Sequence, residues 1–131
     1  MNLLIDTCVF LWATGEPERL STPASRAIRD GDTEVHVSVV TLWEVLLKHG
    51  KGQLELDTRN DSALGFLLDQ CEIHHFTLLG IDIPTLEPLE RLPRIHRDPF
   101  DRMLICQVIE HGLALVTPDA AIRHYPIKTF W

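Results

Sequence analysis

Four acidic residues in this chain stand where an apolar segment ends or where a helix is expected to begin. They are Asp6, Glu44, Asp101 and Asp119. Apolar neighbours place them against the core: Asp6 follows Leu3–Ile5, and Glu44 interrupts the apolar run 42–47. A carboxylate taken out of water without a partner destabilises a fold, so a chain that carries four of them in this way needs a compensating cation. Converging oxygen ligands suit a hard divalent ion such as Mg²⁺ or Mn²⁺.

Short apolar strands alternate with helical segments along the chain. The residue pattern predicts strands over 2–5, 34–40, 72–78, 113–117 and 127–130. It predicts helices over 8–13, 21–29, 41–49, 62–70, 84–92 and 98–111, and a short helix that starts at Asp119. Two of the helices open with a polar cap and an early Pro, and Gly112 ends the long one. The alternation predicts a single α/β domain over residues 1–131, built as a three-layer α/β/α sandwich with a mainly parallel central sheet.

The expected fold brings the acids to one edge of that sheet. In parallel sheets the functional site lies at the carboxyl ends of the strands. Asp6 and Asp119 fall at such ends, and Glu44 lies about one helical turn beyond another. The sequence therefore predicts that the acids share a site.

Each acid also has a structural explanation of its own. Asp6 and Asp119 both follow strands, where an Asp often caps a helix or a turn. Glu44 has Lys48 four residues later, and such a surface pair contributes only about 0.2–0.5 kcal/mol. One shared site accounts for all the acids together, whereas the structural explanations must each hold separately.

Asp98 and Asp101 open the same predicted helix but differ in their expected roles. Asp98 precedes Pro99 and has the pattern of an N-cap, with Pro at the first helical position. Asp101 is in line with Leu104, Ile105 and Val108, so it extends the stripe that faces the core. We therefore interpret Asp101 as the ligand and Asp98 mainly as the cap, with a supporting part in the site.

Composition limits the partners. The formal charge of −7 argues against a nucleic-acid partner unless metal ions neutralise several of the acids. Basic residues gather around the third acidic motif, at 91–102. No apolar run approaches the roughly 20 residues of a membrane helix, and the first residues do not read as a signal peptide. The three Cys are scattered and indicate buried thiols in a reducing cytoplasm, without a disulfide framework or a zinc site.

Other chemistries fit the sequence less well. His74 and His75 are adjacent on a predicted strand, point to opposite faces and make a poor metal pair. No H-E-x-x-H motif and no Gly-rich phosphate loop are present. Cys8 stands where haloacid-type phosphatases carry a second Asp, and a Cys there is more typical of core packing than of a nucleophile.

Four ordered motifs resemble those of the PIN-domain ribonucleases. They are Leu3-Leu4-Ile5-Asp6-Thr7, the segment 38–44 ending in Glu44, His96-Arg97-Asp98-Pro99-Phe100-Asp101-Arg102-Met103-Leu104-Ile105, and Thr117-Pro118-Asp119. The length and the third motif look most like VapC-type toxins of type II toxin–antitoxin pairs. The resemblance covers essentially the whole chain.

The resemblance implies a Mg²⁺- or Mn²⁺-dependent endoribonuclease with Asp6, Glu44, Asp101 and Asp119 as catalytic metal ligands. Thr7, Ser38, Asp98 and Thr117 match supporting polar positions. It also implies a cognate antitoxin and toxin homodimers in the cytoplasm.

The mechanism expected from such a site is hydrolysis of RNA by a metal-activated water. Lys48, Arg97 and Arg102 are candidates for holding the RNA backbone. The alternative is a catalytically inactive PIN-like module that binds RNA or a partner. The sequence leaves open which RNA is cut and whether the site holds one ion or two.

Overall fold

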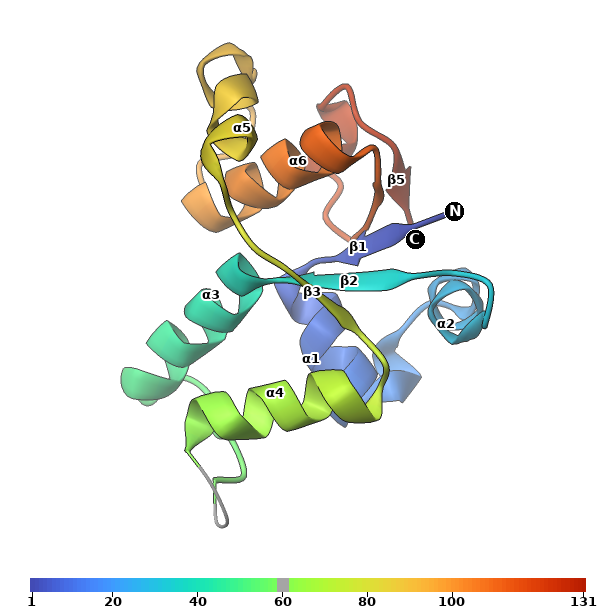
Figure 1. Cartoon of the computed structure of the whole chain (residues 1–131), viewed down its shortest axis with the longest axis vertical. Coiled ribbons are helices and arrows are strands. Elements are labelled where there is room, and N and C mark those ends of the chain that lie inside the picture. The colour runs from blue at the N-terminus through green and yellow to red at the C-terminus, as the bar shows by residue number, and fades with distance from the viewer. Residues whose placement is uncertain (59–61) are drawn as a thin grey trace.

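The computed structural model describes residues 1–58 and 62–131. Within this part of the chain, five parallel strands form one sheet in the order β3-β2-β1-β4-β5 (Figure 1). The strands are β1 (Leu3–Ile5), β2 (Val35–Ser38), β3 (Thr77–Leu79), β4 (Ala114–Val116) and β5 (Thr129–Phe130). The chain begins in the middle of the sheet and builds outward on both sides.

Helices cover both faces of the sheet. They are α1 (Thr7–Gly15), α2 (Thr22–Arg29), α3 (Val39–Gly50), α4 (Ala63–Ile73), α5 (Ile83–Leu86) and α6 (Pro99–His111). The 3₁₀ helices η1 (Pro17–Arg19), η2 (Glu87–Arg91) and η3 (Ile122–His124) complete the connections. None of the described helices is long and apolar enough to cross a membrane.

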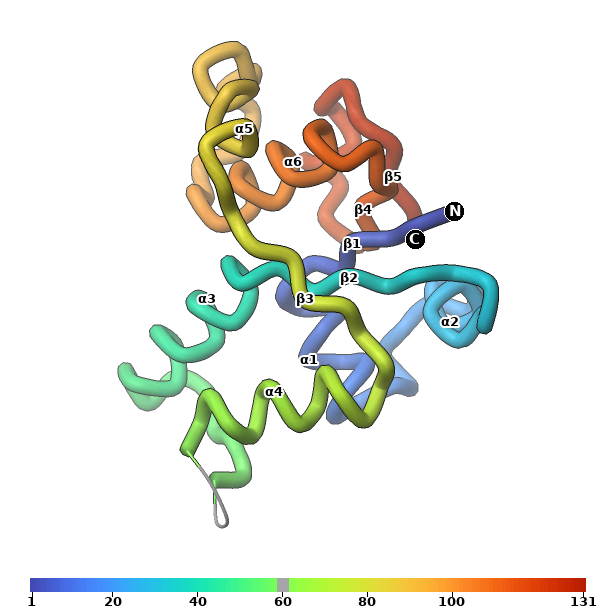
Figure 2. Tube along the Cα trace, in the orientation of Figure 1, coloured from blue at the N-terminus to red at the C-terminus, as the bar shows by residue number. Residues whose placement is uncertain are grey.

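The layers follow from the alternation of side chains along β1. Leu3 and Ile5 point to one face, where they pack with residues of α1, α2, α3 and α4. Leu4 points to the other face, into a second core formed chiefly by α6 and η3. Figure 2 shows α5 and α6 on one side of the sheet and α1, α2 and α4 on the other. The predicted three-layer α/β/α sandwich with a parallel sheet is confirmed.

Some predicted boundaries are wrong, and the structure gives the reasons. The strand expected from residue 72 starts only at Thr77, because α4 continues to Ile73 and buries Cys71 one turn after Leu67. His74 and His75 therefore lie in the turn before β3 and not on a strand, with His75 at φ 57°.

Local hydrogen bonding explains the other shifts. The strand expected to reach residue 40 ends at Ser38, whose hydroxyl accepts a hydrogen bond from the Val40 amide and so starts α3 early. The helix expected over 84–92 divides into α5 and η2, because Pro88 has no N–H to continue the α-helical ladder. The helix expected from Asp119 is the 3₁₀ turn η3.

The long helix α6 has the ends that the sequence predicts. Asp98 is its N-cap and Pro99 its first residue. Gly112 terminates it at φ 64°, a left-handed conformation that L side chains rarely adopt. This placement brings the start of α6 to the carboxyl edge of the sheet.

Candidate active site

Asp6 leaves β1 and enters the site as the N-cap of α1. Its Oδ1 accepts hydrogen bonds from the Val9 amide at 2.9 Å and from the Cys8 thiol at 3.3 Å. The residue is only 5% exposed, and this burial raises the pKa of its carboxyl, opposed by hydrogen bonds from Thr117 and Val9. Asp6 is thus both a helix cap and a buried acid.

Asp119 follows β4 through Thr117 and Pro118. The Thr117 hydroxyl accepts a hydrogen bond from the Asp119 amide at 3.1 Å and also hydrogen-bonds to the Asp6 carboxylate. Asp119 Oδ1 in turn accepts from the Ala121 amide at 2.9 Å. One buried hydroxyl therefore connects the acids that follow β1 and β4.

Asp101 sits in the first turn of α6, three residues after its cap. Asp98 Oδ1 accepts from the amides of Phe100 at 2.8 Å and Asp101 at 3.4 Å, which fixes the start of the helix. The cap also brings the Asp98 carboxylate close to that of Asp101, where it is one of the causes that raise the pKa of Asp101.

Glu44 projects from α3 and is held by two partners. Its Oε1 accepts from the Thr7 hydroxyl at 2.7 Å, and its Oε2 pairs with Lys48 Nζ at 2.8 Å. Thr7 also contacts the buried Thr41 hydroxyl at 3.2 Å. The hydrogen bond from Lys48 to Glu44 raises the pKa of the lysine. Thr7 therefore orients Glu44, while Ser38 acts on the same helix only as its cap.

All four acids line one pocket of about 250 Å³. Thr7, Cys8, Leu11, Lys48 and Asp98 complete its walls. The acids do not close into one tight cluster, however. In the described ranges, the potential ligand atoms that all lie within 4.8 Å of one another belong to His96, Asp101 and Asp119. Asp6 and Glu44 face the same pocket while held by their own hydrogen bonds.

The electrostatics of this pocket favour a cation. Burial, together with Asp98, Asp6 and Glu44, raises the pKa of Asp101 to about 7 against the opposing effect of His96. Carboxylates that hinder one another's ionisation are stabilised by a divalent ion, and an oxygen-rich donor set suits Mg²⁺ or Mn²⁺. The residues present therefore fit such an ion. The Cys8 thiol is a poor ligand here, because burial and Asp6 raise its pKa and keep it protonated.

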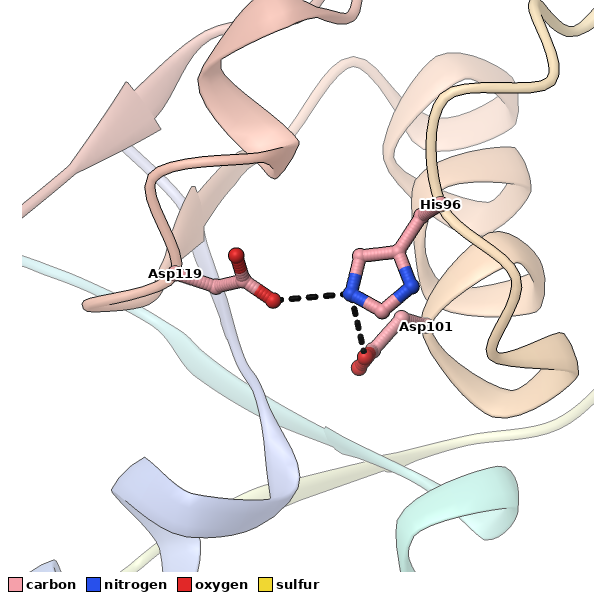
Figure 3. A group of neighbouring side chains, drawn as sticks. All are labelled: His96, Asp101 and Asp119. Atoms are coloured by element: carbon pink, nitrogen blue, oxygen red, sulfur yellow. Dashed lines mark hydrogen bonds and ion pairs between the residues drawn. The ribbon is translucent and has the colours of Figure 1, made fainter.

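His96 belongs to this site, although the sequence pattern indicates no role for it beyond the basic cluster and the third motif that contain it. Its Nε2 lies 2.8 Å from Asp119 Oδ2 and 3.2 Å from Asp101 Oδ2 (Figure 3). The one sequence feature that could have indicated this role is the position of His96 two residues before the Asp98 cap. In the structure, the His96 ring faces the start of α6, where its Nδ1 accepts a hydrogen bond from the Asp98 amide.

The candidate RNA-binding residues lie in different surroundings. Lys48 is engaged by Glu44, and Arg102 Nη1 donates to the Pro93 carbonyl at 2.9 Å and to Tyr125 Oη at 3.3 Å. Arg97 is exposed. A second pocket of about 680 Å³ adjoins the site through His96 and is lined by Leu89, Arg94, His96, Arg97, Pro99, Arg102 and Met103.

The fold and the pocket together define an α/β domain with an acidic site at the carboxyl edge of a parallel sheet. The sequence pattern of the family described as PIN domain matches residues 3–128. The chain is 32% identical over 125 residues to Ribonuclease VapC22 of Mycobacterium tuberculosis, covering 95% of this chain and 92% of that protein. It therefore belongs to the PIN domain family, and the resemblance found in the sequence is confirmed.

Solved structures agree on the fold. The crystal structure of VapBC2 from Rickettsia felis bound to a promoter DNA fragment contains a chain that superposes with a TM-score of 0.73 at 12% identity, over 99% of this chain and 98% of that one. A toxin–antitoxin complex from Klebsiella pneumoniae gives 0.64 at 16% identity, over 98% and 96% of the two chains. FitAcB from Neisseria gonorrhoeae gives 0.63 at 20% identity with the same coverage.

Proposed function

We propose that this protein is a Mg²⁺- or Mn²⁺-dependent endoribonuclease and the toxin of a type II toxin–antitoxin pair. The observation that carries the proposal is the pocket into which Asp6, Glu44, Asp101 and Asp119 all project, with the pKa of Asp101 raised to about 7. The likeness to a protein named a ribonuclease and to structures of toxin–antitoxin complexes supports it.

The four acids would hold the ion. A divalent ion held there would supply activation of water and neutralisation of charge on the scissile phosphate. The protein's own groups do the positioning: the Thr7 hydroxyl orients Glu44, and the Thr117 hydroxyl bridges Asp6 and the Asp119 amide. Only one histidine, His96, approaches the acids within the described residues, so no His pair serves 2′-hydroxyl chemistry. We expect products with a 3′-hydroxyl and a 5′-phosphate.

The larger pocket beside His96 is where we place the RNA backbone. Arg94 and Arg97 are both exposed there, and neither has a hydrogen bond or ion pair within the described part of the chain. Arg102 lines the same pocket and Lys48 lines the acidic pocket. Both already bind protein groups, so they contribute mainly positive potential. Phosphate contacts of this kind position the substrate and do not read its bases.

The partners follow from the same proposal. A cognate antitoxin would inhibit the enzyme in the cytoplasm, and the toxin would form homodimers. Co-purification with a small protein encoded beside the toxin gene, together with the mass of the complex in solution, tests both.

The central experiment is cleavage of an RNA panel by the purified protein, with and without EDTA. We expect cleavage in Mg²⁺ or Mn²⁺ that EDTA abolishes and that Asp6→Asn also abolishes, with unchanged circular dichroism. RNA binding without cleavage in any divalent ion would instead identify an inactive PIN-like binding module.

A matched pair of double variants tests the RNA path. Arg94→Ala with Arg97→Ala should weaken binding of RNA to the Asp6→Asn protein by about tenfold. The double variant should also lower the slope of log K against log salt concentration by the equivalent of one to two phosphate contacts. Arg26→Ala with Arg29→Ala removes two exposed arginines from α2 and serves as the control. Equal losses in the two pairs would rule out a specific path beside His96.

A further inference from the structure

The cluster of His96, Asp101 and Asp119 has the arrangement of a three-ligand metal site. Its potential ligand atoms lie within 4.8 Å of one another, and Figure 3 shows the imidazole Nε2 between the two carboxylates. A nitrogen ligand would make the site a mixed one and shift its preference toward transition metals. Whether His96 can be that ligand depends on which ring nitrogen carries the proton.

The hydrogen bond at the other ring nitrogen, Nδ1, determines where the ring proton lies. The backbone N–H of Asp98 donates a hydrogen bond to His96 Nδ1 at 3.1 Å. A nitrogen that accepts a hydrogen bond presents its lone pair, so the ring proton is on Nε2. A proton on Nδ1 would face the Asp98 amide hydrogen directly.

Nε2 has the surroundings that a donor requires. Its neighbours are Asp119 Oδ2 at 2.8 Å and Asp101 Oδ2 at 3.2 Å, both acceptors. Coordination of an ion by Nε2 requires the lone pair there, and hence a proton on Nδ1 and the loss of the Asp98 hydrogen bond. Asp98 cannot easily turn away, because it is also the N-cap of α6.

The backbone of His96 is anchored as well. Its N–H donates to Tyr125 Oη at 2.7 Å, and Tyr125 is only 3% exposed. Arg102 stabilises the segment that contains Pro93 and His96, because it donates hydrogen bonds to Tyr125 Oη and to the Pro93 carbonyl. The ring is therefore held in place independently of the carboxylates that it contacts.

We propose that His96 is a positioning residue and not a metal ligand: its Nε2–H holds Asp101 and Asp119 in the orientation in which they receive the ion. Hydrogen-bond donors behind metal-binding carboxylates typically contribute about 10- to 100-fold to metal affinity. The part of this inference that concerns the ion rests on the proposed function, whereas the position of the ring proton does not.

The first measurement needs no metal and observes the unchanged site, with a variant used only to assign the signals. In long-range ¹H–¹⁵N spectra of the metal-free protein, assigned by the signals missing from His96→Gln, Nε2 of His96 should be protonated and Nδ1 unprotonated. A proton on Nδ1 and a bare Nε2 would overturn the inference.

The second measurement uses Mn²⁺ alone as the probe. Pulsed EPR of the Mn²⁺-loaded wild type should show no directly coordinated nitrogen, and a coordinated nitrogen that disappears in His96→Gln would overturn the inference. If calorimetry finds no Mn²⁺ binding to the wild type, the proposed function fails, while the spectra of the metal-free protein still decide the position of the proton.

A pair of amide variants separates donation from simple packing. Gln places its amide nitrogen about where Nε2 stands, whereas Asn places it near Nδ1. We expect His96→Gln to keep Mn²⁺ affinity within about threefold and His96→Asn to lose about 10- to 100-fold. His124→Gln and His124→Asn, at an exposed histidine of η3, are the controls, and thermal unfolding checks all four variants. Equal losses in both His96 variants would overturn the role of the donor.

Discussion

The two sides of the acidic pocket are neutralised differently. On the α3 side, Glu44 receives the Thr7 hydroxyl at 2.7 Å and the Lys48 ammonium at 2.8 Å. On the α6 side, Asp101 lies near Asp98, and within the described chain its side-chain partner is His96 and no lysine or arginine. Burial and the neighbouring acids therefore raise the pKa of Asp101 to about 7.

This difference indicates on which side of the pocket the binding of a divalent ion is most favourable. An ion near Asp101 and Asp119 would neutralise carboxylates that repel one another, whereas at Glu44 it must compete with Lys48. We therefore expect the α6 side to set metal affinity and the α3 side to adjust it. Three experiments test this contrast, in order of decreasing effect.

The largest effect is expected from Asp101→Asn. The variant keeps the shape of the side chain but removes the negative charge of a proposed metal ligand, so cleavage in Mg²⁺ should fall by more than about 100-fold, beyond the usual effect of a supporting residue. Initial rates on one RNA measure this. Asp69→Asn, at an exposed acid of α4, is the control and should cut at the wild-type rate. Wild-type activity in Asp101→Asn would contradict the assignment.

The second effect is on stability and its dependence on pH. A carboxyl whose pKa is higher in the folded state binds its proton more tightly there, so its contribution to stability is lost as the pH rises from about 4 to about 7. Without metal at pH 8, wild type should be less stable than Asp101→Asn by on the order of 2 kcal/mol, after discounting for partial exposure.

Urea unfolding of both proteins in EDTA, from pH 4 to pH 8, measures this difference. The difference in unfolding free energy should be near zero at pH 4 and should shrink again at pH 8 when Mn²⁺ replaces the EDTA. A difference that is constant across this range would show that Asp101 has no raised pKa.

The smallest effect is expected on the α3 side, from Lys48→Met. Loss of the ammonium leaves Glu44 buried without its cation, so the metal-free protein should lose about 1–2 kcal/mol of unfolding free energy. Metal affinity should change in the opposite direction and rise a few-fold, since the competing charge is gone. Lys51→Met, at the exposed end of α3, is the control for both measurements. A fall in affinity would mean that Lys48 helps to bind the ion.

The sequence predicts the fold well because each element carries its own signals. Leu3–Ile5 has no polar face, so it reads as a strand covered on both sides, and Asp98, Pro99 and Gly112 mark both ends of α6. The boundary at residue 72 was wrong because Cys71 and Ile73 suit a strand or a helix equally well. Only packing against Leu67 and the core decides for the helix.

The site is harder to predict because its contacts join distant residues. Each acid stands out in the sequence only through its own apolar neighbours. Nothing local indicates that Thr7 reaches Glu44 across 37 positions or that His96 reaches Asp119 across 23. The tautomer of His96 depends on a backbone amide two residues away, in a geometry set by the loop and not by residue type.

The caps of α1 and α6 have a consequence for a substrate that carries negative charge. Asp6 and Asp98 both line the pocket, so two helix N-termini end at its walls. Each such terminus carries the equivalent of about half a positive charge through its aligned peptide dipoles. The backbone therefore adds a fixed positive field to a pocket whose side chains are acidic. That field does not titrate and cannot be removed by changing a side chain. It would help a protein of net charge −7 to accept a phosphate once its carboxylates are occupied.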